Sequence, residues 1–459
     1  MHPKFAVIGY PNKGKSTIVA NLTLNDDIVI SNTPGTTTKA NSYKLEVDGK
    51  VVYELIDTPG FQRAREVLSW LKEHNVDASK RLDVVKEFVA KFKDNPKFKD
   101  EIELLTPIIQ GAGVIYVVDA SKPYSIEYEA QMEILRWTSA PSMAILNFIG
   151  KSDYSKEWKL ALNQYFKIVK SFNPMEFNYQ AHIDLLEAMS HLKEEWSSLV
   201  KKSIKLFKEY IDLKIYKSAV EIVQMLKDIT YLKERLSSKD SPQNRQKLEE
   251  LYKDKIKNLE ESHHKKIKLI WEHKNIDIEE DELIFKDLEL FSTKTEEIFG
   301  LSKKELISIS ATVGAAIGGG VDLALLGHTF FLGALTGAAV GAVSGYFGAN
   351  KVSEIKILGV KLGKEYLEIG PIKNINFLFT LLNRALIFTI SVAKYSHAKQ
   401  EKLKLEDLKK VKTMLNSSDK STLYKFNKKL IDNKLSQEDE DKFINTISNI
   451  LKRNITKEK

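Results

Sequence analysis

One short segment decides the fold of the first part of this chain: Gly9-Tyr10-Pro11-Asn12-Lys13-Gly14-Lys15-Ser16. It matches the pattern G-x-x-x-x-G-K-S. The apolar run 5–9 predicts a buried strand, and the residues from 15 to about 24 predict a helix. The motif requires this strand–loop–helix context. Successive backbone N–H groups of such a loop, together with the N-terminus of its helix, can surround an anion. The segment therefore predicts a phosphate-binding loop.

The residue types in this loop predict separate roles. We expect Gly14 to let the backbone approach the phosphates and Lys15 to place a mobile positive charge beside the β- and γ-phosphates. The Ser16 hydroxyl is a candidate magnesium ligand, and Thr17 is a candidate contact to the α-phosphate. The other loop residues with a predicted nucleotide contact are Gly9, Asn12 and Lys13.

A second motif, Asp57-Thr58-Pro59-Gly60, follows a predicted strand at 51–56. A carboxylate at a strand end can hold a metal ion through water, so Asp57 is a candidate magnesium residue. The backbone N–H of Gly60 can donate to a γ-phosphate and turn away when that phosphate leaves. At this place after a phosphate-binding loop, the pattern D-x-x-G predicts a switch segment.

Between these motifs lies the hydroxyl-rich run Thr33-Pro34-Gly35-Thr36-Thr37-Thr38. A threonine here can ligate magnesium when the γ-phosphate is present and so order its loop. Thr37 is the preferred candidate and Thr36 the second. The alternative is an ordinary turn rich in hydroxyl side chains.

Residues 1–180 alternate strand-like and helix-like segments, with a charged, helix-like insert at about 61–105. Asp48-Gly49 between apolar runs predicts a two-residue hairpin. The pattern predicts an α/β domain with a mostly parallel sheet and crossover helices. The further predicted elements are strands at 114–119 and 143–147, a helix at 127–138 and a candidate last strand at 166–172.

Together the three motifs resemble the Era/TrmE-like branch of the translation-factor-class GTPases, over about 170 residues. The resemblance implies that the domain binds GTP and GDP with Mg²⁺ and hydrolyses GTP. Phe61 follows Gly60 where Ras-like enzymes carry a water-orienting glutamine, which a phenyl ring cannot replace. Members with this replacement hydrolyse slowly alone, and faster when homodimerisation, another residue or a cation completes the site. Asn12 stands where potassium-stimulated members place an asparagine, which implies a candidate K⁺ ligand.

The whole chain also resembles an uncharacterised bacterial family that joins such a GTPase domain to a C-terminal domain of unknown function with a glycine-rich apolar segment. The run from Glu127 to Thr138 is similar to the one in that family. This resemblance implies a two-part protein and assigns no cellular role to it.

The motif that reads guanine is degenerate. In the branch it is N-K-x-D, and here the predicted strand ends in Asn147-Phe148-Ile149-Gly150. Asn147 remains a candidate nucleotide contact, whereas Asp153 could replace the missing carboxylate only if the loop rearranges. Discrimination between guanine and adenine depends on such polar contacts. The family favours GTP, and ATP stays an alternative.

The rest of the chain is predicted to be mainly α-helical. Residues 181–300 predict a long helical hairpin, broken at 237–242. Residues 301–459 predict a domain with a glycine-rich apolar hairpin at 306–348 and a basic helical tail. In that hairpin, glycines recur every four residues at positions 333, 337, 341 and 345.

Three interpretations of segment 306–348 compete: a membrane-inserting hairpin, a hairpin buried in the protein or at an oligomer interface, and a loop. Against insertion, Asp322 near the centre of a span would cost about 3 kcal/mol. Flanking lysines suit an anionic lipid surface, although most of them are expected to be solvated.

The composition sets outer limits for the 459-residue chain. It carries 70 Lys+Arg and 62 Asp+Glu, a mild net charge of +8 that favours contact with anionic lipid or nucleic acid but identifies neither. With no cysteine, disulfides, thiolate metal sites and cysteine nucleophiles are excluded. We expect a cytoplasmic protein, peripheral or integral at the inner membrane if 306–348 inserts. Binding to nucleic acid or the ribosome has no supporting signature. A nucleotide-controlled membrane scaffold and a nucleotide-binding pseudo-enzyme are the alternatives to a GTPase switch.

Overall fold

The computed structural model describes residues 2–25, 28, 39–47, 49–175, 177–273, 290–317, 350–352, 356–357, 360–361, 366–396 and 414–456. The chain divides into two compact units. The first comprises Met1–Ile211, Lys394–Gln400 and Thr456–Lys459, and the second comprises Asp212–Ala393 and Glu401–Ile455. We call them the α/β unit and the helical unit.

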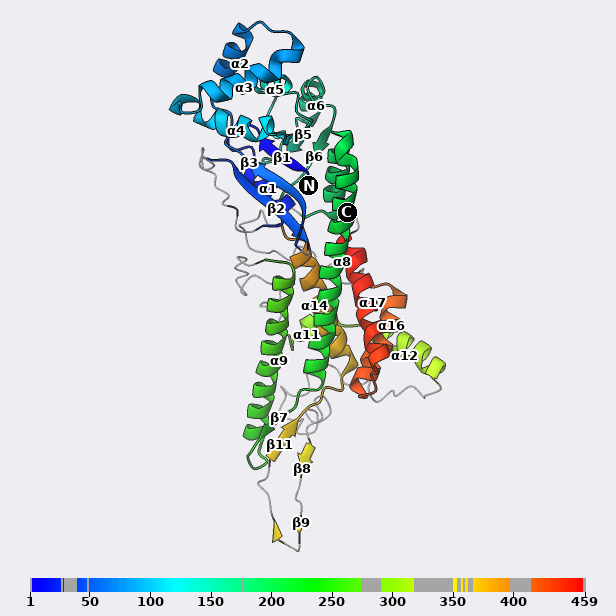
Figure 1. The fold of residues 1–459 in the computed structure, drawn as a ribbon. Helices are drawn as coiled ribbons and strands as arrows, with labels where there is room; N and C mark the ends of the chain where they lie inside the picture. The colour runs from blue at the N-terminus through cyan, green and yellow to red at the C-terminus, as the bar shows by residue number, and fades with distance from the viewer. Residues whose placement is uncertain are drawn as a thin grey trace. The chain divides into compact units, whose positions relative to one another are not determined.

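The α/β unit is built on a six-stranded sheet (Figure 1). In spatial order its strands are β2 (Asn41–Val47), β3 (Lys50–Asp57), β1 (Lys4–Ile8), β4 (Gly113–Asp119), β5 (Ser142–Asn147) and β6 (Val169–Ser171). All neighbours are parallel except β2 and β3, which form an antiparallel hairpin. The prediction of a mostly parallel α/β sheet is therefore confirmed.

The central strands are apolar because helices cover both faces of the sheet. Every residue of β4 is buried, as in a parallel sheet with two covered faces. The predicted hairpin is confirmed: Val47 pairs with Lys50, and Gly49 has a left-handed φ of 71°. The predicted strand at 166–172 was too long, because the N–H of Phe166 still bonds to Leu162 O at the end of a helix, and only β6 pairs.

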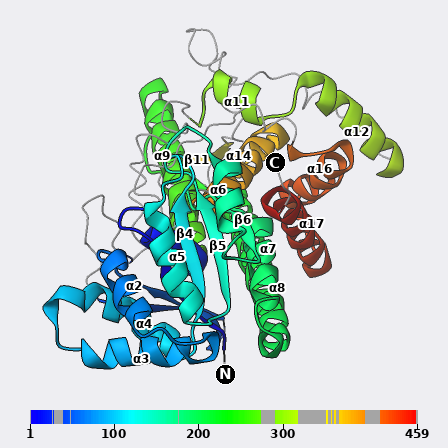
Figure 2. The ribbon, with the colours of Figure 1, turned by 90° about the horizontal axis from the view of Figure 1, so that it is seen from above.

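Helices α2 (Ala64–Glu73), α3 (Arg81–Lys91) and α4 (Lys99–Ile109) form the helical region between β3 and β4. Short 3₁₀ turns, η1 (Ala78–Lys80) and η2 (Pro96–Phe98), join them. Figure 2 shows these helices grouped at one side of the sheet. Their core contains an aromatic cluster, with ring contacts among Trp70, Phe88, Phe92 and Phe98. The α/β unit also contains helices α1 (Lys15–Thr23), α5 (Glu127–Trp137), α6 (Ser155–Leu162) and α7 (Tyr179–Ser190).

The helical unit contains the predicted antiparallel pair. Helix α8 (Glu194–Thr230) contributes its residues from 212 onward, and α9 (Pro242–Ile270) lies along them (Figure 1). The pair is joined by Trp271 Nε1, which donates to Ser218 Oγ at 3.0 Å, and by His263, whose Nδ1 lies 2.5 Å from Glu221 Oε1. The predicted break is confirmed, because Ser241 caps α9 and Pro242 opens it.

The other described elements of the helical unit are short strands and helices. They are β7 (Glu234–Leu236), α11 (Thr293–Phe299), α12 (Lys303–Ile317), β8 (Asn350–Val352), β9 (Lys356–Ile357), β10 (Val360–Lys361), β11 (Tyr366–Ile369), α14 (Ile375–Lys394, which ends in the α/β unit), α16 (Ser417–Ile431) and α17 (Gln437–Thr456). Of the glycine-rich segment 306–348, only residues 306–317 are described, as part of α12. Its four-residue glycine row lies outside the described residues.

Within the described part of the chain, α14 alone is long and apolar enough to cross a membrane. Most of it is buried inside the protein, and two of its polar side chains bond to other parts of the helical unit. Asn383 Nδ2 donates to Phe299 O at 2.6 Å, and Arg384 pairs with Glu260 of α9 at 2.7 Å. These contacts are those of a core helix.

Candidate functional site

The candidate site lies at the edge of the sheet where β1, β3, β4 and β5 end. The strands are parallel and in register there: Val7 pairs with Asp57, and Asp119 pairs with Asn147. Loops that follow the carboxyl ends of parallel strands meet at one edge, where α/β proteins bind ligands. This edge brings together the loop 9–16, the segment 57–60 and Asn147, which are far apart in the sequence.

The phosphate-binding loop needs glycine at two positions. Gly9 has a φ of 153°, and a Cβ there would lie 2.3 Å from Val117 O. Gly14, the N-cap of α1, has a left-handed φ of 81°, and its Cβ would lie 2.3 Å from Asn147 Nδ2. Asn12 is also left-handed, with a φ of 58°. Residues with positive φ in such a loop help to turn successive N–H groups toward a common centre.

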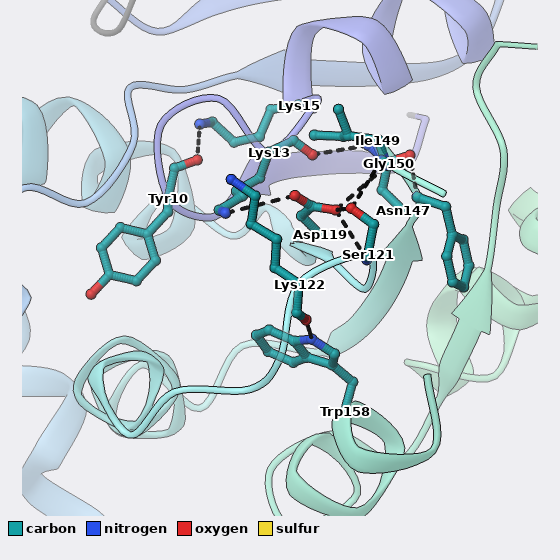
Figure 3. A network of polar contacts seen from close by, with 11 residues as sticks. Tyr10, Lys13, Lys15, Asp119, Ser121, Lys122, Asn147, Ile149, Gly150 and Trp158 are labelled. Carbon is teal, nitrogen blue, oxygen red and sulfur yellow. Dashed lines mark hydrogen bonds and ion pairs between the residues drawn. The ribbon is translucent and has the colours of Figure 1, made fainter. Parts of the chain in front are cut away.

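Lys15 is buried at the first position of α1, with only 7 % of its surface exposed. Its Nζ donates to Tyr10 O at 3.0 Å (Figure 3). Burial lowers the pKa of Lys15 to about 8, and the Asp57 carboxylate opposes only part of that shift. A buried ammonium whose hydrogen-bond acceptor is a main-chain carbonyl is well suited to receive an anion.

Ser16 and Asp57 lie side by side. Ser16 Oγ donates to Asp57 Oδ2 at 2.6 Å, and Asp57 is buried. Hydroxyl and carboxylate oxygens are the hard donors that Mg²⁺ prefers when substrate phosphates and water complete its shell. The pair therefore fits magnesium. Thr17, the next residue of α1, is half-buried.

The segment 57–60 is packed against the phosphate-binding loop. Thr58 Oγ1 donates to Val7 O at 2.7 Å in the interior. A Cβ at Gly60 would lie 2.5 Å from Pro11 N, so the backbone at Gly60 approaches the loop more closely than any other residue type permits. Phe61 is buried in the same hydrophobic core as Phe88. The structure therefore places Gly60 beside the phosphate-binding loop.

Asn147 connects the base-side loop to the phosphate-binding loop. Its Nδ2 donates to Lys13 O at 3.0 Å, and its Oδ1 accepts from Phe148 N at 2.9 Å (Figure 3). The Lys13 side chain turns the other way, with Nζ 3.9 Å from Asp119 Oδ2. Lys13 thus offers its backbone to the loop, while its charge faces a buried carboxylate.

Sequence reasoning missed Asp119, which organises the base-side loops. It is 1 % exposed, and its Oδ1 accepts from Ser121 N at 3.1 Å, Ser121 Oγ at 2.5 Å and Ile149 N at 3.4 Å. Ser121 Oγ in turn accepts from Gly150 N at 2.9 Å. The sequence signal was an acidic residue ending the apolar run 114–119.

Asp153, the predicted substitute for the missing carboxylate, already accepts a hydrogen bond from the backbone. Its Oδ1 accepts from Ser155 N at 2.8 Å at the start of α6, and Asp153 is exposed. The structure thus places Asp153 two residues before α6, near the positive end of that helix. Thr36 and Thr37 lie outside the described residues, so their roles stay predictions, as does the role of Asn12 toward K⁺.

Two protein-family models match the chain. Residues 4–148 match the model described as "50S ribosome-binding GTPase". Residues 159–449, more than half of the chain, match the model described as "Domain of unknown function (DUF3482)". The two matches follow each other along the sequence, as the expected two-part organisation requires.

Curated relatives align with the N-terminal part. GTPase Der of Borreliella burgdorferi is 29 % identical over 173 residues, 36 % of this chain and 38 % of that protein. The tRNA modification GTPase MnmE of Mycoplasmoides gallisepticum is 24 % identical over 230 residues, 46 % of this chain and 48 % of that protein. The chain therefore spans less than half the length of these relatives.

Among solved structures, a variant of Era from Aquifex aeolicus bound to GDP and AlF4⁻ is 16 % identical, with a TM-score of 0.26. The match covers 37 % of this chain and 50 % of that one. The sheet order, the phosphate-binding loop and the two family models agree on the organisation of the molecule. The chain belongs to the family of the domain of unknown function DUF3482 and carries an N-terminal GTP-binding domain of the P-loop GTPase class.

Proposed function

We propose that the protein is a magnesium-dependent GTPase that works as a molecular switch, with the helical unit as its output. One observation carries this proposal: the buried ammonium of Lys15 and the Ser16–Asp57 pair lie at the same edge of the sheet as Gly60. The three features serve the three needs of phosphoryl transfer, which are charge on the β- and γ-phosphates, a metal site and a donor to the γ-phosphate.

In the proposed reaction, the loop 9–16 holds the phosphates of GTP through its N–H groups. Lys15 exchanges its contact with Tyr10 O for oxygens of the β- and γ-phosphates. Ser16 directly, Asp57 through water and Thr37 from the preceding loop would hold Mg²⁺, which neutralises charge on the phosphates. Water attacks the γ-phosphorus in line, and the bond to the β–γ bridging oxygen breaks, giving GDP and phosphate. The Gly60 N–H donates to the γ-phosphate during this step.

The proposed conformational switch depends on the position of Gly60 beside the phosphate-binding loop. When the γ-phosphate leaves, its contact to the Gly60 N–H is lost and the segment is free to change conformation. We propose that this change is transmitted to the helical unit. Phe61 is buried and cannot orient water, so a slow intrinsic rate is expected, with K⁺ at Asn12 or a second copy of the chain as candidate accelerators.

The proposed nucleotide is GTP, on the strength of the N-terminal domain match. ATP is the alternative, because residue 150 is glycine and the Asp153 carboxylate accepts from Ser155 N at the start of α6. The family description "50S ribosome-binding" and the name of MnmE raise a ribosomal or tRNA partner. A net charge of +8 over 459 residues adds little support for such a partner.

We propose separately that segment 306–348 contacts a membrane. The protein would then be cytoplasmic and either peripheral or integral at the membrane. This proposal is supported by the low charge of that segment and its four-residue glycine row. Flotation of the full chain and of a variant lacking 306–348 with anionic liposomes tests it. Loss of flotation in the deletion supports an anchor, and equal behaviour of both proteins excludes one.

The function is tested by measuring phosphate release by the full chain from GTP and from ATP. Each nucleotide is supplied with Mg²⁺ or with EDTA, and in K⁺ or Na⁺ buffer. We expect magnesium-dependent release that is faster with GTP and faster in K⁺. A Ser16→Ala variant should lose most of the rate. Tight nucleotide binding without any phosphate release would identify a pseudo-enzyme and contradict the proposal.

A further inference from the structure

Helix α4, in the region between β3 and β4, carries a buried carboxylate that accepts hydrogen bonds from the backbone just after Gly60. Glu101 is 1 % exposed, and its Oε1 accepts from Gln62 N at 2.9 Å and from Arg63 N at 2.6 Å. Its other oxygen, Oε2, is buried with no hydrogen-bond partner among the described residues. Two backbone amides just after the switch segment 57–60 therefore hold this carboxylate.

The burial of Glu101 has an electrostatic explanation. Glu101 lies in the first turn of α4, and Arg63 is the N-cap of α2. The carboxylate thus lies at the positive ends of two helices, whose partial charges stabilise an anion. Hydrogen bonds from backbone N–H groups to an ionised oxygen are also stronger than neutral ones. The contact therefore stabilises the backbone conformation at Gln62 and Arg63.

The same backbone is held at two neighbouring points. Gly60 packs against Pro11 of the phosphate-binding loop, and the Phe61 side chain is buried in the core of the α2–α4 region. With Glu101 on the next two amides, each of four successive residues has a contact that holds it in this conformation. The orientation of the Gly60 N–H therefore depends on α4 as well as on the phosphate-binding loop.

A second carboxylate of α4 reaches toward the other predicted switch. Glu103 Oε2 accepts from Ala40 N at 3.0 Å, two residues after the threonine run 33–38. One helix thus contacts the backbone just after both predicted switch segments.

We propose that Glu101 is a positioning residue of the nucleotide site, through which α4 holds the Gly60 N–H in the orientation that donates to the γ-phosphate. The α2–α4 region thereby restrains the backbone of the switch segment, and we call the contact of Glu101 with the two amides the brace. This inference rests on the proposed function, because it assigns Glu101 a part in recognising the γ-phosphate. Loss of the brace should affect the triphosphate state and spare the diphosphate state.

The test compares Glu101→Ala and Glu101→Gln with a matched control, Asp100→Ala, in the full chain. Asp100 lies in the same helical turn, so the control removes an equal charge near the end of α4. Three quantities are measured: amide hydrogen exchange at 60–63 without nucleotide, the Kd for GDP against a non-hydrolysable GTP analogue, and kcat with KM for GTP. Circular dichroism and a thermal melt confirm that each variant folds.

In Glu101→Ala we expect exchange at 62 and 63 to rise, affinity for the analogue to fall about 10-fold, and kcat to fall about 10- to 100-fold, as for loss of a charged hydrogen bond. The Kd for GDP should stay within about threefold of wild type. Glu101→Gln keeps an accepting oxygen and should recover most of the loss. The control should match wild type.

Two results would overturn the inference: equal loss of affinity for GDP and the analogue, or a folded Glu101→Ala variant that matches the control in exchange, in the ratio of the two affinities and in kcat. If wild type releases no phosphate, the proposed function fails. The exchange measurement and the ratio of the two affinities still decide whether Glu101 braces the switch segment.

Discussion

Each of the two units buries a strongly basic side chain, and the two are held differently. In the α/β unit, Lys15 is 7 % exposed and donates to the main-chain oxygen of Tyr10. In the helical unit, Arg384 is 3 % exposed and forms two hydrogen bonds with the Glu260 carboxylate, at 2.7 and 3.0 Å.

The difference separates a binding site from a structural contact. A guanidinium that pairs with a carboxylate through two parallel bonds is neutralised within the protein. An ammonium held by a carbonyl keeps its charge for a partner. We therefore place the chemistry in the α/β unit and a structural role in the Arg384–Glu260 pair.

The largest expected effect is on stability. Arg384→Met leaves the Glu260 carboxylate buried without its guanidinium partner, and removal of one member of a buried pair costs about 3–5 kcal/mol. Urea unfolding followed by circular dichroism should show this loss in free energy of unfolding, while the GTP affinity of the α/β unit stays unchanged. The double variant Arg384→Met/Glu260→Met should regain most of the stability. An equally stable single variant would show that the pair is not structural.

A smaller effect is expected on the pH dependence of nucleotide binding. The pKa of Lys15 in the free protein is about 8. A bound phosphate favours the ammonium and raises this pKa, so binding at about pH 8.5 should take up protons, and affinity should fall as the pH rises further. Calorimetry in buffers of different ionisation enthalpy measures the uptake. At about pH 7 Lys15 is charged in both states, and the uptake should largely vanish. Equal uptake at both pH values would contradict this account.

The smallest effect is expected on the selectivity for the nucleotide base. Residue 150 carries no carboxylate, so loss of the guanine 2-amino group should matter little, and inosine triphosphate should bind within about threefold of GTP. Gly150→Asp should widen this ratio and Gly150→Asn should not. A Cβ at 150 would lie 3.0 Å from Ser121 Oγ, so both variants require that side chain to shift. A wild-type preference for GTP over inosine triphosphate of about 100-fold or more would show that another group reads the base.

The phosphate-binding loop could be predicted because its information is local. Eight consecutive residues carry the glycines, the lysine and the hydroxyl, and the neighbouring residues predict the strand and the helix. Asp119 and Glu101 could not be found in this way. Their main partners include backbone amides far away in the sequence, at Ile149 and at Gln62 and Arg63. In the sequence, Glu101 has the pattern of a solvated charge in a charged, helix-like insert.

Helix α14 shows the same limit for apolar segments. The helix Ile375–Lys394 is long and apolar enough for a membrane span, and only the packing shows that it lies in a protein core. The structural signs are the bonds of Asn383 and Arg384 to other parts of the helical unit. Composition alone cannot separate a core helix from a span.

The central claim, that Lys15 grips the phosphates of a magnesium-bound nucleotide, is tested most directly by the affinity of Lys15→Ala for Mg–GTP. The matched control is Lys122→Ala, which removes an exposed lysine near the same site (Figure 3). We predict an affinity loss of about 100-fold for Lys15→Ala and little change for the control. A folded Lys15→Ala variant that binds Mg–GTP as tightly as wild type would contradict the account.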